Sequence, residues 1–347
     1  MERLSIQLQT AYAELLDQLV AMDAQRAIGH SGGTFVRKRL KGQEYCYYQH
    51  ALPGRIAQTY VGRRSPALDR VVERFKEGRE VAATERRRTM RLCALLRSGG
   101  AMTIDGPSAR VLDALADAAV FRLGGVLVGT QAFLAIGNLL GVRWGGAGTR
   151  TEDIDIVGER DLAVAVPTVT ADVPRVLESL EMGFLPVPGL SPRHPTTSFK
   201  VRGRALRVDV LTPQTGSTTS PVPIARFRTA AQPLRYLDYL IQGPQQAALL
   251  AGSGILVNVP SPARFALHKL VVSRSRPATQ QAKSAKDLDQ AAQIIDLLAA
   301  DRPGDLALAW DALAKRQSLA TAARAGLAVL RRRHSDAHAA VMAEIDR

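Results

Sequence analysis

The segment TEDIDIV, residues 151–157, places two carboxylates two positions apart inside an apolar stretch. In a β-strand alternate side chains project from the same face, so Asp153 and Asp155 share one face while Ile154 and Ile156 occupy the other. Like charges held this close repel each other, and burying them without a partner is costly. The pattern therefore predicts a strand with one apolar face and a positively charged group between the two carboxylates.

A further acidic strand follows in LRVDVL, residues 206–211, where Asp209 stands between two valines. A carboxylate in an apolar strand needs a hydrogen-bond network or a cation to compensate its burial. The chain also contains a useful contrast, because Asp287 and Asp289 have the same spacing as the first pair but lie in a helical pattern. Side chains two apart on a helix do not face each other. Spacing alone is therefore a weak signal, and the strand context makes it informative.

Three strand carboxylates that meet at one point suit Mg²⁺, which takes carboxylate oxygens together with phosphates. Two such ions can hold both the attacking and the leaving oxygen of an in-line phosphoryl displacement. We therefore predict that Asp153, Asp155 and Asp209 are catalytic and hold Mg²⁺, in a two-metal site. The positive group between the acids is then expected to be a metal-bound nucleotide.

Phosphates also need a binding site, and VLVGTQAF supplies a candidate. Here a strand ends in Gly129-Thr130 and a helix opens directly. Such a junction offers backbone N–H groups and the positive end of the helix dipole to an anion. Alone, the junction is more often structural. Its value lies in the order along the chain: strand, Gly-Thr, helix, then two acidic strands.

The rest of the sequence divides into an N-terminal region, a region of alternating strands and helices that contains these motifs, and a helical C-terminal region. Residues 2–27 have helical spacing, residues 33–64 form about three short strands, and a helix is expected from Ser65-Pro66 to Arg97. Short strands then alternate with helices, including a hairpin in residues 198–213 and strand-like pieces in 235–241, 246–250 and 254–260. From residue 261 onward the pattern is helical. We expect an α+β protein with an N-terminal appendage (1–100), a catalytic domain (101–260) and a C-terminal helical domain (261–347).

The chain is strongly basic, with a net charge of +14, and the excess is densest in residues 1–100. This favours an acidic partner, nucleic acid or nucleotide phosphates, although an Arg-rich surface without such a partner is the alternative. In residues 33–64 tyrosines are interleaved with Lys and Arg, an arrangement that can stack on bases and hold phosphates. The alternative is that the tyrosines pack on neighbouring helices.

Targeting and redox signals are sparse. Cys46 and Cys93 form neither a metal-ligand spacing nor a disulfide framework, which fits a reducing compartment. The N-terminus lacks the features of a signal peptide, and no run approaches the ~20 apolar residues of a membrane span. A cytoplasmic protein with no membrane partner is expected.

The order of motifs resembles the nucleotidyltransferase superfamily that includes DNA polymerase β, the CCA-adding enzymes and the AbiEii- and MenT-type toxins. The context RTEDID and the helix RFALHKL followed by KSAKDLDQA look most like the AbiEii-type subgroup and a related bacterial nucleotidyltransferase-fold family. The resemblance implies a polymerase β-like domain and a magnesium-dependent transfer of NMP from an NTP to a hydroxyl group. It places Gly129, Thr130, Arg150, Thr151 and Lys269 at the nucleotide.

The same resemblance implies an acceptor, RNA of a tRNA-like kind or a protein, and a toxin-like role in which an antitoxin-like partner restrains the enzyme. Two departures from the family pattern stand out: Thr130 replaces the commoner serine, and the gap from Thr130 to Asp153 is long, with GVRWGGAG inserted. The alternative function is a nucleic-acid-binding protein that keeps the nucleotidyltransferase fold without catalysis.

Overall fold

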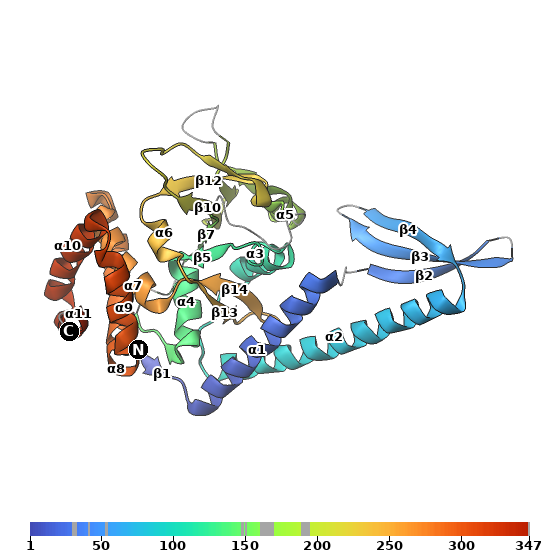
Figure 1. Cartoon of the computed structure of the whole chain (residues 1–347), viewed down its shortest axis with the longest axis horizontal. Helices are drawn as coiled ribbons and strands as arrows, with labels where there is room; N and C mark the ends of the chain where they lie inside the picture. The colour runs from blue at the N-terminus through green and yellow to red at the C-terminus, as the bar shows by residue number, and fades with distance from the viewer. Residues whose placement is uncertain are drawn as a thin grey trace.

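The computed structural model describes residues 1–29, 33–40, 42–52, 55–146, 149, 151–159, 170–188 and 195–345 of the 347-residue chain. Figure 1 shows a body that contains the mixed sheet and most helices, and an arm that extends from it. The arm consists of two long helices and a small sheet at their far end.

The arm begins with β1 (Glu2–Arg3), which pairs with β6 (Val142–Arg143) of the body. The helices α1 (Ile6–Gly29) and α2 (Pro66–Ser98) then run in opposite directions along each other. The Ser65 hydroxyl accepts a hydrogen bond from the backbone N–H of Leu68 and caps α2, as the sequence predicts. This helix ends at Gly99, also close to the predicted stop.

The small sheet at the end of the arm is the predicted three-stranded meander, with its strands antiparallel and in the order β2-β3-β4. Its strands are β2 (Gly33–Leu40), β3 (Gln43–Leu52) and β4 (Arg55–Arg63). One face packs on α2, where the Phe75 ring lies 5.1 Å from Phe35 and 5.9 Å from Tyr48, centroid to centroid. The other face carries Tyr45, Tyr47 and Tyr60, because alternate residues of a strand point in opposite directions.

A seven-stranded mixed sheet forms the centre of the body. Its strands are β5 (Val126–Val128), β7 (Asp153–Val157), β8 (Phe184–Pro186), β9 (Ser198–Val201), β10 (Arg207–Pro213), β11 (Val222–Ile224) and β12 (Thr229–Leu234). The main path is β11-β12-β10-β7-β5, with β9 beside β10 and β8 beside β9. β10 is parallel to β7 and β12 but antiparallel to β9, so the predicted hairpin is confirmed.

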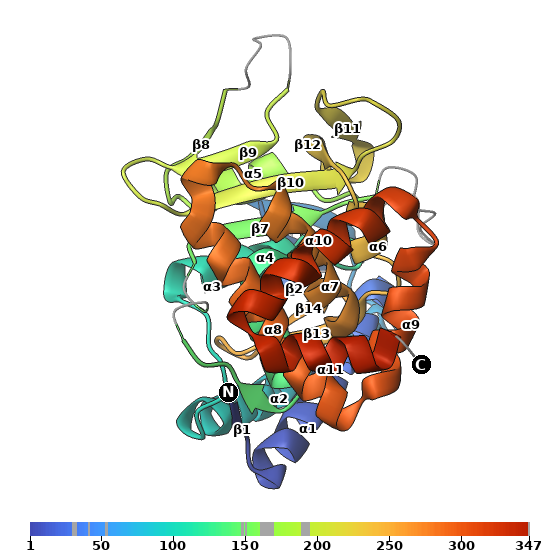
Figure 2. The same cartoon turned by 90° about the vertical axis from the view of Figure 1, so that its left-hand side faces the viewer.

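Helices and one hairpin enclose this sheet. They are α3 (Gly106–Asp117), α4 (Gly129–Leu139), α5 (Val173–Ser179), η2 (Ala225–Phe227) and the hairpin of β13 (Gln245–Leu249) and β14 (Ile255–Val259). The predicted C-terminal helices follow as α7 (Pro262–Ser275), η3 (Ala278–Gln280), α8 (Gln281–Asp301), α9 (Pro303–Ala314), α10 (Gln317–Arg333) and α11 (Ser335–Ile345). Figure 2 shows them covering one side of the body. Buried residues form one continuous cluster from Val111 to Val341, so sheet and helices share a core.

One predicted strand is wrong. Residues 235–241 do not extend the sheet; they form a turn and the short helix α6 (Leu237–Leu240). Their alternating apolar residues suggest a strand, but Leu237 and Leu240 are both buried, and positions three apart share a helix face. Tyr236, with φ of 67°, also turns the chain immediately before the helix.

Two simpler expectations concern cysteines and membranes. Cys46 and Cys93 are both buried and unpaired by disulfide. Within the described ranges, none of the helices combines the length and apolar character that crossing a bilayer requires. The three-domain division at residues 100 and 260 stays a prediction.

Candidate active site

Two of the three predicted catalytic carboxylates are direct neighbours in the sheet. In the parallel pairing of β10 with β7, Asp209 is the partner of Asp155, and Arg207 is the partner of Asp153. Neighbouring strands lie about 4.8 Å apart, and partner side chains project from the same face. The opposite face of both strands is fully buried, with Ile154 at 0 % exposure. Burial of that apolar face fixes which way the acids point.

The surroundings of Asp155 disfavour its negative charge. Burial, and after it the carboxylates of Asp209 and Asp153, raise the pKa of Asp155 to about 7, while Lys269 and Arg207 act in the opposite direction. In the part of the chain that the structure describes, no donor forms a hydrogen bond with this carboxylate. Asp155 is thus a half-buried carboxylate whose charge is only partly compensated by the protein.

Arg207 is a charged neighbour that the sequence analysis missed. Its Nε donates to Oδ1 of Asp209 at 2.8 Å and to the Ser198 hydroxyl at 2.8 Å. The sequence predicts a positive group among these acids and assigns it to a metal-bound nucleotide; the protein itself supplies one such group. Arg207 lies two positions before Asp209, so the same period-two rule that paired the acids also places Arg207 on their face.

The Gly129-Thr130 junction lies against this acidic pair. β5 pairs with β7 so that Val128 is opposite Asp155, and α4 begins at the next residue. Gly129 has φ of +70°, and a Cβ on it would lie 2.5 Å from Oδ2 of Asp155. Only a residue without a side chain lets the carboxylate approach the start of the helix so closely. The first turn of α4, including the buried Thr130, is therefore next to Asp155.

Lys269, predicted to contact the triphosphate, is held by another carboxylate. Its Nζ lies 2.7 Å from Oδ1 of Asp287, which is 2 % exposed, and Arg276 binds the other oxygen at 2.5 Å. Burial alone would raise the pKa of Asp287, but Lys269 and Arg276 hold that pKa below its usual value. Lys269 is still close enough to lower the pKa of Asp155. It contributes positive charge near Asp155 while it is bound to Asp287.

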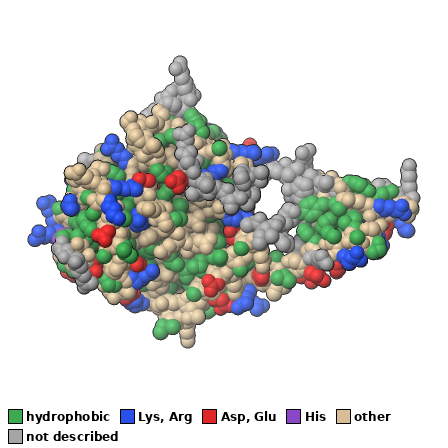
Figure 3. All heavy atoms as spheres, viewed as in Figure 1, with side chains coloured by type: hydrophobic (Ala, Val, Ile, Leu, Met, Phe, Trp, Pro, Cys, Tyr) green, Lys and Arg blue, Asp and Glu red, His purple; other side chains and the backbone are tan. Residues whose placement is uncertain are grey.

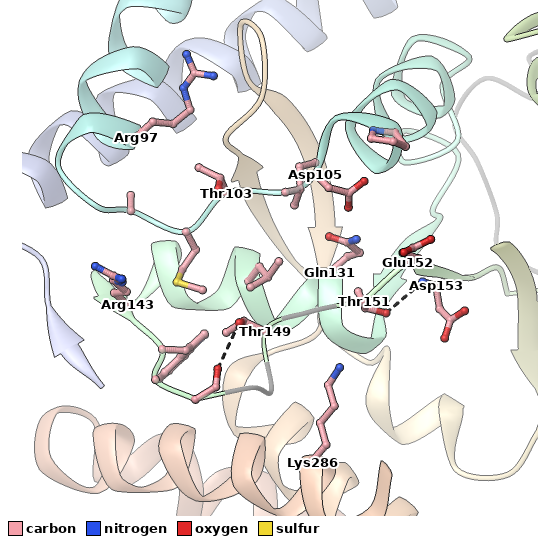
Figure 4. A pocket seen from close by; sticks show the side chains of 18 of the residues that line it. Arg97, Thr103, Asp105, Gln131, Arg143, Thr149, Thr151, Glu152, Asp153 and Lys286 are labelled. Carbon is pink, nitrogen blue, oxygen red and sulfur yellow. Dashed lines mark hydrogen bonds between the residues drawn. The ribbon is translucent and has the colours of Figure 1, made fainter. Parts of the chain in front are cut away.

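A cavity of about 1710 Å³ opens beside Asp153. Figure 4 shows Thr151, Glu152 and Asp153 along one side of it, with Lys286 reaching in from α8. The Thr151 hydroxyl accepts a hydrogen bond from the backbone N–H of Asp153 at 3.1 Å, which fixes the start of β7. Arg150, the remaining nucleotide-binding prediction, lies outside the described residues.

Lys286 is the second charged residue that the sequence analysis did not single out. Burial lowers its pKa, and Lys269 does so too, while Asp287 and Asp153 act to raise it. The signal was present in the quoted KSAKDLDQA segment, but helical spacing alone does not tell which lysine faces the strand acids. Both lysines of that segment, Lys283 and Lys286, line the cavity, whereas Lys269 of α7 does not.

The strand carboxylates suit Mg²⁺ as a partial set of ligands. Among the described residues, no group of three or more His, Cys, Asp or Glu side chains is arranged as a ready-made metal site. Mg²⁺, however, is usually bound through one or two carboxylates and completed by waters and substrate phosphates. Asp155 and Asp209 are neighbours, and the negative charge of Asp155 is only partly compensated by the protein, so the pair fits that mode. The residues present suit a hard cation that arrives with phosphate.

Comparisons with known proteins agree with this chemistry. A family model described as "Nucleotidyltransferase" matches residues 107–315, more than half of the chain. The matched region contains the Gly129-Thr130 junction, both acidic strands and Lys269. No curated protein and no solved structure matches the chain.

Proposed function

The chain belongs to a nucleotidyltransferase family and is a transferase enzyme, and from this premise we propose that it moves an NMP from an NTP to a hydroxyl group in a Mg²⁺-dependent reaction. One observation carries the proposal: Asp155 and Asp209 are direct strand partners, and Asp155 lies against the first turn of α4. Carboxylates next to a helix N-terminus bring a cation site and a phosphate site together. We further propose that the domain is polymerase β-like, of the AbiEii and MenT kind.

In this proposal Asp155 and Asp209, with Asp153, would hold the magnesium ions. When bound, they would neutralise phosphate charge and align the attacking and leaving oxygens. The backbone N–H groups at Gly129 and the Thr130 hydroxyl bind phosphate oxygens. The acceptor oxygen forms a bond to the α-phosphorus, pyrophosphate leaves, and Asp209 takes the proton of the acceptor hydroxyl.

The remaining residues act on the nucleotide around this centre. Lys286 is the best-placed cation for the triphosphate, since it lines the cavity beside Asp153. Lys269 keeps its proposed nucleotide role as a nearby positive charge, and Arg150 and Thr151 stay proposed contacts to the nucleotide. The cavity of about 1710 Å³ leaves room for an acceptor as well as an NTP.

We favour RNA of a tRNA-like kind as the acceptor because the chain has a net charge of +14. A protein hydroxyl is the second candidate. A toxin-like role with an antitoxin-like partner follows from the resemblance and stays a proposal. The alternative of a non-catalytic nucleic-acid-binding protein is set aside, because the chain belongs to an enzyme family.

The test uses each α-³²P-labelled NTP with Mg²⁺, total RNA and cell lysate, and locates the label by gel. Wild type is expected to label one acceptor class, and Asp155→Asn is expected to lose this activity by at least about 100-fold, about 2.7 kcal/mol in activation free energy. The matched control is Asp311→Asn, an exposed acid on α9. If Asp155→Asn labels the acceptor at the wild-type rate, the proposal is wrong.

A further inference from the structure

We propose that the outer face of the arm's meander, defined by Tyr45, Tyr47, Tyr60 and Lys38, binds the RNA acceptor by base stacking. This inference rests on the proposed function, because it names where the acceptor is held. The sheet has two chemically different faces. Its inner face is covered by α2 through Phe75, and its outer face is not covered by any described element.

The three outer tyrosines form one cluster. Tyr47 and Tyr60 are partners across β3 and β4, with ring centroids 5.6 Å apart, and the Tyr45 ring lies 6.1 Å from Tyr60. Tyr60 is 57 % exposed, which is unusual for a large ring on a sheet that already has a packed side. The sequence left open whether these rings are core or surface, and the strand register places them on the surface.

The charge around the cluster suits phosphate. Residues 33–64 contain seven Lys or Arg and one acid, Glu44. Arg64 neutralises Glu44, with 2.6 Å between their charged atoms, on the side of the sheet that faces α2. On the outer face, Nζ of Lys38 lies 5.1 Å from the centre of the Tyr47 ring, and Arg63 is the strand partner of Tyr45. Flat aromatic rings between cations match single-stranded nucleic acid, whose bases stack while its phosphates pair with the cations.

In Figure 3 hydrophobic side chains gather on the lobe at the end of the arm, with Lys and Arg side chains beside them. A second copy of the chain is the less favoured occupant, because two such faces would bring their cations together. Repulsion between like charges opposes that contact, whereas a polyanion removes it.

The length of α2 sets the size of the partner. Its 33 residues span about 50 Å at 1.5 Å per residue, from the meander at Pro66 to the cavity, which Arg97 helps to line. Figure 1 shows α2 running from the meander to the body. A mononucleotide cannot reach both places, whereas a folded RNA can hold its body on the arm and its terminal hydroxyl near Asp155. The arm thus favours a long acceptor over a small one.

The experiment measures the affinity of the full-length chain for fluorescently labelled bulk tRNA as a function of salt concentration. Tyr60→Ala is expected to weaken binding by about five- to 150-fold with the salt slope unchanged, because stacking releases no counterions. Lys38→Gln is expected to weaken binding and to reduce the salt slope by about one. Leu308→Ala, which truncates a 71 % exposed side chain on α9, is the matched control and should bind as wild type.

Two results would overturn the inference. One is wild-type tRNA affinity in both Tyr60→Ala and Lys38→Gln, with thermal denaturation showing that each is folded. The other is a dimer in sedimentation velocity that Tyr60→Ala dissociates while tRNA affinity stays unchanged. Either result leaves the proposed function intact, provided that wild type still transfers label and Asp155→Asn does not. Conversely, Tyr60-dependent tRNA binding without any transfer by wild type would contradict the proposed function alone.

Discussion

Asp155 of β7 and Asp209 of β10 are direct partners in a parallel strand pair, and the Asp155 carboxylate lies against the start of α4. The arrangement is unfavourable for the protein alone, because burial and the neighbouring acids raise the pKa of Asp155 to about 7. Functional sites often contain such groups, since the charge is needed for a ligand rather than for the fold.

The first prediction is that Asp155→Asn is more stable than wild type although it is inactive. The folded-state pKa of Asp155 lies above its unfolded value, so ionisation destabilises the folded protein. The gain in free energy of unfolding should be absent near pH 4, grow as pH rises, and be complete above about pH 7. Because each pKa unit corresponds to about 1.4 kcal/mol and the pKa rises from 3.8 to about 7, a gain of about 4 kcal/mol is expected. Thermal denaturation from pH 4 to 8 measures it, and a less stable variant at pH 8 would refute it.

The second prediction concerns Gly129→Ala. The added Cβ would lie 2.5 Å from Oδ2 of Asp155, and φ of +70° adds backbone strain. We expect a loss of about 1–2 kcal/mol of stability from the strain, together with a large loss of transfer activity. Gly243→Ala is the control, because Gly243 has φ of +66° and nothing within 4 Å of its Cβ position. It should be destabilised to a similar extent and keep its activity; equal activity losses in the two variants would point to strain alone.

The third prediction separates the structural role of Lys269 from its proposed role at the nucleotide. Lys269→Met leaves the buried Asp287 with Arg276 as its remaining ion-pair partner, and should cost about 3 kcal/mol of stability. The double variant Lys269→Met/Asp287→Leu removes both charges and should regain most of this loss. Urea denaturation measures both effects. Arg3→Met, at a pair whose side chains are 58 % and 36 % exposed, is the control and should leave stability nearly unchanged.

The double variant then tests the nucleotide role. If Lys269 supports NTP binding through its charge, the KM for NTP should rise in this variant although its stability is restored. A KM equal to that of wild type would limit Lys269 to the ion pair with Asp287.

The fourth prediction concerns acid sensitivity. Burial, and after it the charge of Lys269, lower the pKa of His268 to about 4. Between pH 6.5 and 4 the unfolded chain therefore binds more protons at this position, so stability is full above pH 6.5 and falls as the pH drops. The loss at pH 4 should be about 3 kcal/mol. His268→Gln should lose less stability than wild type over this interval, and His338→Gln, on α11, should follow wild type. If stability falls equally with pH in wild type and both variants, His268 is not the cause of the acid sensitivity.

Local sequence was sufficient for the elements that carry the motifs. Period-two alternation placed Asp153 and Asp155 on one strand face, Ser65 marked the start of α2, and Gly129-Thr130 marked a strand-to-helix junction. These features are set within a few residues by side-chain direction, by caps and by the backbone freedom of glycine. In residues 235–241 the local pattern is ambiguous, and it predicts a strand where the structure has the short helix α6.

The sequence by itself determined which face of each strand carries its acids, that a glycine opens α4, and that the arm is basic and rich in tyrosine. Only the tertiary structure decided that Asp209 is the partner of Asp155, that Arg207 binds Asp209, and that Lys269 is held by Asp287. Those contacts depend on strand register and on the packing of helices from distant parts of the chain. Both are fixed by burial of the shared apolar core, because slipping a strand by one residue would turn its apolar side chains toward water.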